Sequence, residues 1–139
     1  TNIKLSDNPV PNFEKIYNEY PSGYLTVPVV GAGTVNTEFE IMTGMNLDDF
    51  GSGELPFKTV LTNHTSESIC YNLKEYGYKC HAIHNNTATF YGRNKVFSNL
   101  GYDTFSSIET MNITEFTPTG WAKDKFLKDE ILDTLDLYN

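Results

Sequence analysis

A glycine-rich turn between a strand pattern and a helix pattern is the feature that most restricts how this chain can fold. Residues 24–30 are rich in β-branched and aromatic side chains, which predicts a strand with an edge or bulge at Pro28. Gly31-Ala32-Gly33 follows, and residues 34–43 then carry apolar side chains at helical spacing. A strand, a tight turn and a helix in this order are typical of α/β proteins.

The rest of the sequence continues this alternation. A glycine, Gly101, stands where a left-handed residue would end one of the helices. The remaining expected elements are four helices (residues 11–20, 66–76, 93–100 and 121–138), two strands (78–84 and 102–105) and one long loop (45–61). The predicted fold class is therefore α/β, with a mainly parallel sheet flanked by helices.

Length and charge restrict the class of protein further. The 139 residues correspond to one domain, and a hydrophobic content of 39% is sufficient for a core. The formal net charge is -8 and the ten basic residues are scattered, which argues against nucleic acid as a partner. Cys70 and Cys80 match no metal-binding or thioredoxin-like spacing, so a disulfide and two core thiols are both open interpretations.

Thr34 is the residue in this turn that can carry chemistry. The start of a helix favours an anion such as phosphate, and a threonine there becomes a nucleophile if a metal lowers the pKa of its hydroxyl. The structural alternative is that Thr34 simply caps the helix. Neither a phosphate-binding lysine loop nor a dinucleotide-binding turn is present, because Gly33 is followed by Thr34-Val35-Asn36.

A second group of candidates follows the predicted strand over residues 78–84. His84 stands at the carboxyl end of that strand, where open α/β sheets bind ligands. His81 is three positions earlier, and this spacing on a strand makes the two histidines a poor metal chelate. Phe90-Tyr91-Gly92-Arg93 then brings two aromatic rings next to an arginine, whose planar donors suit phosphate.

Three blocks in a fixed order carry a family resemblance. They are residues 33–40 with Thr43-Gly44; residues 73–78 leading to His84, 90–93 and 99–103; and residues 120–126. Together they resemble the lipoteichoic acid synthase and phosphoglycerol transferase branch of the alkaline phosphatase (sulfatase) superfamily. The resemblance covers most of the chain from about residue 26 onward.

The resemblance implies roles for five residues. Thr34 matches the threonine that acts as nucleophile and binds the divalent metal, Mn²⁺ or alternatively Mg²⁺. His84, Phe90, Tyr91 and Arg93 match residues that bind the glycerol phosphate, although Tyr91 stands where lipoteichoic acid synthases commonly have tryptophan. The implied reaction moves phosphoglycerol from an anionic, phosphatidylglycerol-like lipid to a glycerol or glycan acceptor of the cell envelope.

The resemblance also implies what this chain lacks. The family's metal site uses an acidic residue on a preceding strand and an Asp-His pair farther along, so residues 1–139 are expected to form a partial sulfatase-like catalytic domain, inactive alone. Its parent is expected at the extracellular face of a bacterial cell membrane, anchored by transmembrane helices absent here. The truncated sheet is expected to leave edges through which the chain self-associates.

Other functions remain open at this point. A phosphoethanolamine transferase or another hydrolase of the superfamily shares the threonine chemistry, and a non-catalytic module that binds a cell-wall polymer shares the candidate pocket. The nucleophile motif of sulfate-ester hydrolases, Cys or Ser followed by x-Pro-x-Arg, is not formed at either cysteine: Cys70 is followed by Tyr71-Asn72 and Cys80 by His81-Ala82.

Overall fold

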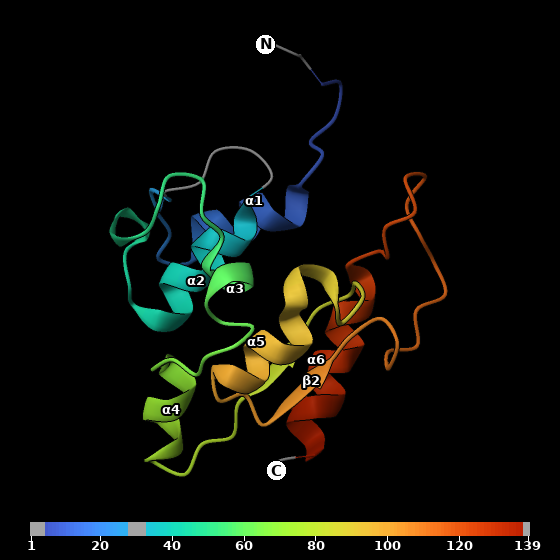
Figure 1. Cartoon of the computed structure of the whole chain (residues 1–139). Helices are drawn as coiled ribbons and strands as arrows, with labels where there is room; N and C mark the ends of the chain where they lie inside the picture. Colours follow the sequence, from blue (N-terminus) through green and yellow to red (C-terminus); the bar gives the residue numbers. More distant parts are fainter. Residues whose placement is uncertain (1–4, 28–32, 138–139) are drawn as a thin grey trace.

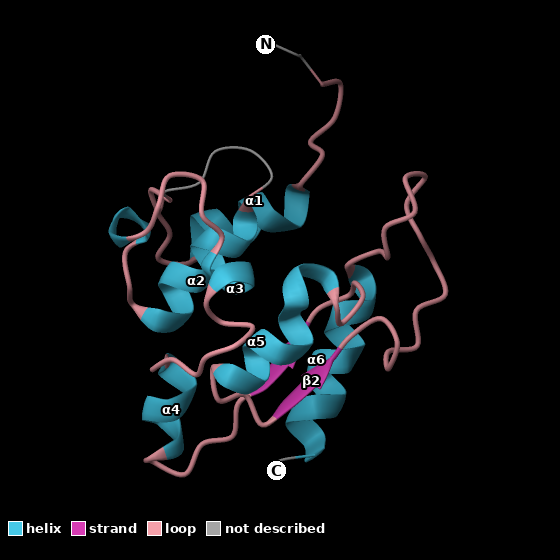
Figure 2. Cartoon of the chain, in the orientation of Figure 1, coloured by secondary structure: helices cyan, strands magenta, loops and turns pink. Residues whose placement is uncertain are grey.

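The computed structural model describes residues 5–27 and 33–137, and helices make up most of its regular structure (Figures 1 and 2). None of the described helices is both long and apolar enough to cross a membrane. In chain order, with η marking 3-10 helices, the elements are α1 (Pro11–Glu19), α2 (Thr34–Thr43), η1 (Leu47–Asp49), α3 (Pro56–Thr59), α4 (Ile69–Lys74), β1 (His81–Ile83), η2 (Phe90–Gly92), α5 (Arg93–Asn99), β2 (Thr104–Ser106) and α6 (Lys125–Leu137).

The sheet is parallel, as predicted, but small. Strands β1 and β2 pair in parallel, with Ala82 opposite Phe105, and α5 forms the crossover between them. Helix α5 contacts β2 and helix α6 contacts β1. The strand predicted over residues 24–30 is not found at 24–27, and its remainder lies outside the described residues. The α/β class is thus confirmed, with two strands in the described part of the chain.

Most helix predictions are correct within a few residues, and the predicted loop is partly wrong. Helix α2 spans the expected residues, and Gly101 follows α5 with a φ of +80°. A Cβ at Gly101 would lie 2.9 Å from the ring of Tyr71, so a side chain there would be strained and would displace that ring. Residues 45–61 contain η1 and α3, because Asn46 caps η1 and Pro56 begins α3 at the position that tolerates proline.

The core joins α2, α3, β1 and α5. Its buried side chains come from segments that are far apart in the sequence: Val35, Phe39, Phe57, Leu61, Ala82, Val96, Phe97 and Leu100. Phe39 also packs edge-to-face on Phe50, with ring centroids 5.2 Å apart. This core anchors the helix that begins at Thr34 against the helix that begins at Arg93.

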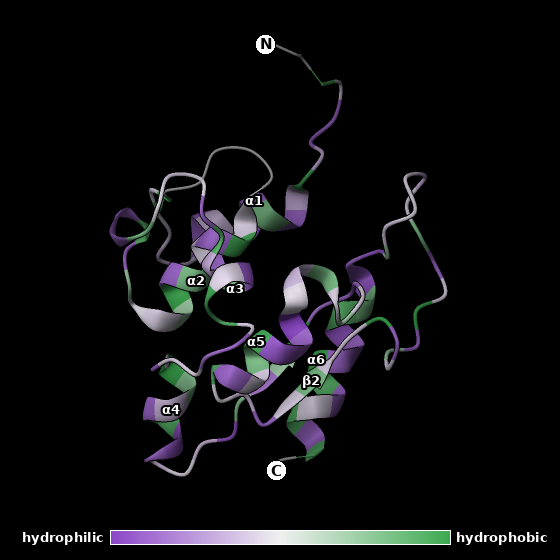
Figure 3. Ribbon diagram, in the orientation of Figure 1, coloured by the Kyte–Doolittle hydropathy of each residue, from purple (hydrophilic) through white to green (hydrophobic). Residues whose placement is uncertain are grey.

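The apolar side chains of the last helix, α6, are not buried. Ile131 is 46% exposed and Leu135 is 56% exposed, and α6 has no buried residue. A two-stranded sheet offers too little surface to cover a helix of 13 residues. Apolar positions along α6, and on α1 as well, are coloured green in Figure 3.

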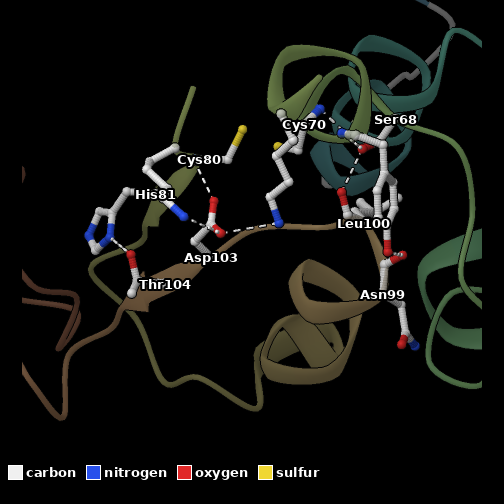
Figure 4. Close-up of polar contacts among 11 residues, drawn as sticks. Ser68, Cys70, Cys80, His81, Asn99, Leu100, Asp103 and Thr104 are labelled. Carbon is white, nitrogen blue, oxygen red and sulfur yellow. Dashed lines mark hydrogen bonds and ion pairs between the residues drawn. The ribbon is translucent and has the colours of Figure 1, made fainter. Parts of the chain in front are cut away.

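Polar contacts link α4 to the end of α5 and to the residue just before β2 (Figure 4). Ser68 caps α4 by accepting the Cys70 N–H at 3.1 Å, and its hydroxyl donates to the Leu100 carbonyl. Cys70 and Cys80 are both buried and free, which confirms the interpretation as core thiols. Burial, together with the neighbouring Cys80 thiol, raises the pKa of the Cys70 thiol to about 12.

Asp103 makes this region sensitive to pH. Its carboxylate accepts the Cys80 N–H at 2.9 Å and lies 3.2 Å from the Lys74 ammonium (Figure 4). The Cys80 hydrogen bond, with help from Lys74, lowers the pKa of Asp103 from its usual value of 3.8. A lowered pKa in the folded state contributes stability above the unfolded value, and this contribution is lost as the pH falls through the folded value.

Asp103→Asn is therefore expected to lower the thermal unfolding midpoint at neutral pH, with a difference from wild type that shrinks as the pH falls below 3.8. Circular dichroism at a series of pH values measures both midpoints. Asp129→Asn, at an exposed position on α6, is the control for removing one carboxylate. A wild-type advantage that stays constant down to acid pH would contradict this role of the carboxylate.

Candidate active site

Helix α2 presents Thr34 at its first turn. The residue that caps the helix is Gly33, with a φ of −94°, and Thr34 is the first helical residue with an exposed side chain. The interpretation of Thr34 as the helix cap is therefore wrong. No side chain caps this helix, and the threonine hydroxyl is left outside that structural role.

The four predicted substrate-binding residues lie together. The rings of His84 and Phe90 stack with centroids 6.2 Å apart, and Phe90 meets Tyr91 edge-to-face at 4.6 Å. The Arg93 guanidinium lies 5.6 Å from the centroid of Phe90 and 5.5 Å from that of Tyr91. Trp121, from the third sequence block, is half exposed and meets Phe90 at 6.1 Å.

A strained turn produces this cluster. Tyr91 has a φ of +57° and is the one non-glycine residue with a left-handed backbone in the described part of the chain. Such a conformation costs about 1–3 kcal/mol and concentrates at ligand sites. Gly92 continues the left-handed turn at +68°, and a Cβ there would lie 3.0 Å from the Thr62 methyl group. The turn directs Arg93 inward as the first residue of α5.

Arg93 is buried in an ion pair rather than open to solvent. Its Nη2 donates to both carboxylate oxygens of Glu38, at 2.6 and 2.9 Å, and its Nη1 donates to the Phe90 carbonyl at 3.1 Å. The Arg93 side chain is 3% exposed and that of Glu38 is 30% exposed. The contact joins α2 to α5 across 55 positions of sequence.

Glu38, His84 and Arg93 line one cavity of about 270 Å³. The Nε2 atom of His84 is buried and has no hydrogen-bond partner among the described residues. Burial and, secondarily, the Arg93 guanidinium lower the pKa of His84, while Glu38 opposes the shift. His84 is therefore neutral at neutral pH. A neutral imidazole next to an arginine can share a phosphate or a hydroxyl group of a ligand.

A complete metal site is not formed by these residues. Residues 5–27 and 33–137 contain no group of three or more His, Cys, Asp or Glu side chains that could hold a metal ion. The Thr34 hydroxyl would be a single oxygen ligand, whereas Mg²⁺ and Mn²⁺ are bound by several oxygen ligands. The described residues alone therefore do not fit a bound cation.

Glu38 is the member of the site that sequence reasoning missed. It belongs to the first sequence block, but no local pattern links it to an arginine 55 positions away. The available signal was its helical spacing, because Glu38 is four residues after Thr34 and lies on the same side of α2. That spacing shows that Glu38 is a neighbour of Thr34, but it does not show that the Glu38 carboxylate pairs with Arg93.

Known proteins resemble this chain over nearly its whole length. The putative cyclic beta-1,2-glucan modification protein of Rhizobium meliloti is 29% identical over 134 residues, which are 96% of this chain and 20% of that protein. The phosphoglycerol transferase GacH of Streptococcus pyogenes, solved in complex with sn-glycerol-1-phosphate, is 26% identical with a TM-score of 0.71, over 89% of this chain and 33% of GacH.

The lipoteichoic acid synthase LtaP of Listeria monocytogenes shares the fold, with a TM-score of 0.77 and 20% identity over 91% of this chain and 30% of LtaP. The chain thus spans between 20% and 33% of the length of these relatives. The sequence model of the sulfatase family matches residues 1–139, the entire chain. This chain therefore belongs to the sulfatase family, in the alkaline phosphatase superfamily, and matches phosphoglycerol transferases in structure.

Proposed function

We propose that this chain is part of a metal-dependent transferase that moves phosphoglycerol from a membrane lipid to an acceptor of the cell envelope through Thr34. The observation that carries the proposal is the cluster of His84, Phe90, Tyr91 and Arg93, of which His84 and Arg93 line a cavity together with Glu38 of α2. The likeness to GacH, whose complex contains sn-glycerol-1-phosphate, supports a glycerol phosphate ligand for that cluster.

The proposed reaction has two displacements at one phosphorus atom. In the first, the Thr34 oxygen forms a bond to phosphorus, the bond to the diacylglycerol oxygen breaks, and diacylglycerol leaves with a proton. In the second, the oxygen of an acceptor hydroxyl forms the new bond to phosphorus, the Thr34–phosphorus bond breaks, and the acceptor's proton goes to the Thr34 oxygen, which restores the hydroxyl. Arg93 would bind the phosphate oxygens, and His84 would bind a hydroxyl or phosphate oxygen. The rings of Phe90 and Tyr91 would contact the glycerol carbons.

A bound divalent metal, Mn²⁺ or alternatively Mg²⁺, would lower the pKa of the threonine hydroxyl. Thr34 would be the ligand that this chain provides, and sulfatase-superfamily enzymes typically depend on a metal. Because one hydroxyl does not hold a cation, we expect residues 1–139 alone to be inactive. The whole protein is proposed to work at the extracellular face of the bacterial membrane, where its lipid donor and acceptor meet.

A glycan is the acceptor that we favour over glycerol. The Rhizobium relative is named for modification of a cyclic beta-1,2-glucan, and its match covers 96% of this chain. The half-exposed Trp121 beside Phe90 offers a flat apolar surface of the kind that binds sugar rings. The acceptor would then approach from the Trp121 side of the cluster.

The donor is tested with two lipid analogues that differ in the headgroup alone. The full-length protein, in Mn²⁺, is expected to turn over a fluorescent phosphatidylglycerol at least about tenfold faster than the matching phosphatidylethanolamine, because a site that hydrogen-bonds glycerol hydroxyls discriminates against a headgroup that lacks them. Release of fluorescent diacylglycerol measures both rates. A preference for phosphatidylethanolamine would favour the phosphoethanolamine transferase, and ligand binding without turnover of either lipid would favour the binding module.

A further inference from the structure

We propose that Glu38 is a positioning residue: its carboxylate fixes the Arg93 guanidinium to α2 and so sets where a bound phosphate lies relative to Thr34. This inference rests on the proposed function of Arg93 and Thr34. It assigns to Glu38 an effect on the reaction that is distinct from binding the ligand.

Arg93 is restrained by its hydrogen bonds to the protein. Both oxygens of Glu38 accept from Nη2, and the Phe90 carbonyl accepts from Nη1, so both terminal nitrogens are held by the protein. With its side chain 3% exposed, Arg93 has little freedom to reorient. Arg93 can therefore bind a phosphate in the cavity only through those of its N–H groups that do not take part in these hydrogen bonds. These groups point in a fixed direction.

Helix α2 fixes the position of Glu38 relative to Thr34. Thr34 and Glu38 are four residues apart in one helix, which places them on the same side, just over one turn or about 6 Å apart along the axis. Val35 follows Thr34 and Phe39 follows Glu38 in the chain. Both are buried in the core and hold this helix in place. Fixing Arg93 to Glu38 therefore fixes the anion-binding group relative to the candidate nucleophile through a rigid element.

The effect of Glu38 on the position of Arg93 differs from its effect on the affinity for the ligand. A carboxylate beside the phosphate site repels the ligand, so Glu38 cannot strengthen ground-state binding through its charge. It neutralises a buried guanidinium, which is costly to leave without a partner. A 1 Å misplacement of a reacting group can lower the rate by about 100-fold. Loss of Glu38 is thus expected to reduce turnover while it leaves affinity unchanged or improved.

The test compares Glu38→Gln, Glu38→Asp and Glu75→Gln in the full-length protein. Glu75 is an exposed carboxylate at the end of α4, so its replacement removes the same charge away from the cavity. Turnover is measured with the fluorescent phosphatidylglycerol in Mn²⁺, and affinity by calorimetry with sn-glycerol-1-phosphate. The His84 ring is titrated by NMR in the absence of both ligand and metal.

Glu38→Gln is expected to lower kcat by about 30- to 100-fold and to leave the Kd for sn-glycerol-1-phosphate within about threefold of wild type or tighter. Glu38→Asp, which keeps the charge, is expected to recover part of kcat, and Glu75→Gln to behave as wild type. Because Glu38 opposes the lowering of the His84 pKa, that pKa is expected to fall further in Glu38→Gln.

Each contrary result has a distinct meaning. A kcat for Glu38→Gln equal to that of Glu75→Gln would overturn the inference, as would a loss of affinity with unchanged kcat. If the wild type neither binds the probe nor turns over the lipid, the proposed function fails, and the NMR titration still decides whether Glu38 acts on the cavity. If Glu38→Gln does not fold, Glu38→Asp decides: a kcat equal to wild type despite the shorter side chain would overturn precise positioning.

Discussion

Thr34→Ala is expected to lower the turnover of phosphatidylglycerol by at least about a thousandfold, because no other oxygen replaces the nucleophile in the first displacement. Its effect on folding is expected to be small. Thr34 is exposed and Gly33 provides the helix cap, so the free energy of unfolding should change by less than about 0.5 kcal/mol. Turnover assays and denaturant unfolding of the full-length protein measure the two effects.

Two further variants complete this test. Thr34→Ser keeps a hydroxyl and is expected to retain measurable turnover. Thr37→Ala, the same substitution three residues farther along α2, is the matched control and is expected to retain turnover near the wild-type rate. Thr34→Ala with turnover equal to that of Thr37→Ala would remove Thr34 from the mechanism and favour the binding module.

Arg93→Gln is expected to affect both binding and stability. Loss of the guanidinium removes charge-assisted hydrogen bonds to phosphate, so the Kd for sn-glycerol-1-phosphate should rise by about 10- to 100-fold. Removing one member of a fully buried ion pair costs roughly 3–5 kcal/mol, but the partner Glu38 is 30% exposed and can be hydrated, so we expect a loss of about 2 kcal/mol. Calorimetry and denaturant unfolding measure these quantities.

Lys95→Gln is the control for Arg93, because Lys95 is an exposed cation on the same helix. It is expected to leave both affinity and stability unchanged. Arg93→Lys keeps the charge but lacks the planar set of donors, so it should recover stability better than affinity. An Arg93→Gln protein that binds the probe as tightly as Lys95→Gln would contradict the role of Arg93 in the ligand site.

The spacing of apolar residues and the positions of glycines predict those helix bounds that depend on interactions between residues close in sequence. The bounds of α2 were correct because Val35 and Phe39 have helical spacing and because Gly44, in a left-handed conformation, ends the helix. The cap at the other end was assigned incorrectly, since threonine is a common cap and a glycine at that position leaves no polar side chain to signal it.

The features that the sequence did not predict depend on packing between segments that are far apart in the chain. The Glu38–Arg93 pair depends on how α2 meets α5, which no spacing in the sequence reveals. The last helix is found close to its predicted position, but burial of its apolar side chains depends on a larger surface than two strands provide. His84, Phe90, Tyr91 and Arg93 were predicted together because they are close in sequence as well as in space.

The central claim is that Thr34 becomes covalently attached to the transferred group, and mass spectrometry of the Thr34 peptide tests it most directly. Full-length protein is quenched with acid during turnover of phosphatidylglycerol in Mn²⁺ and digested. The account predicts a phosphoglycerol adduct on Thr34 in the wild type and in the Thr37→Ala control. An unmodified Thr34 during undiminished turnover, or an adduct on another residue, would contradict it.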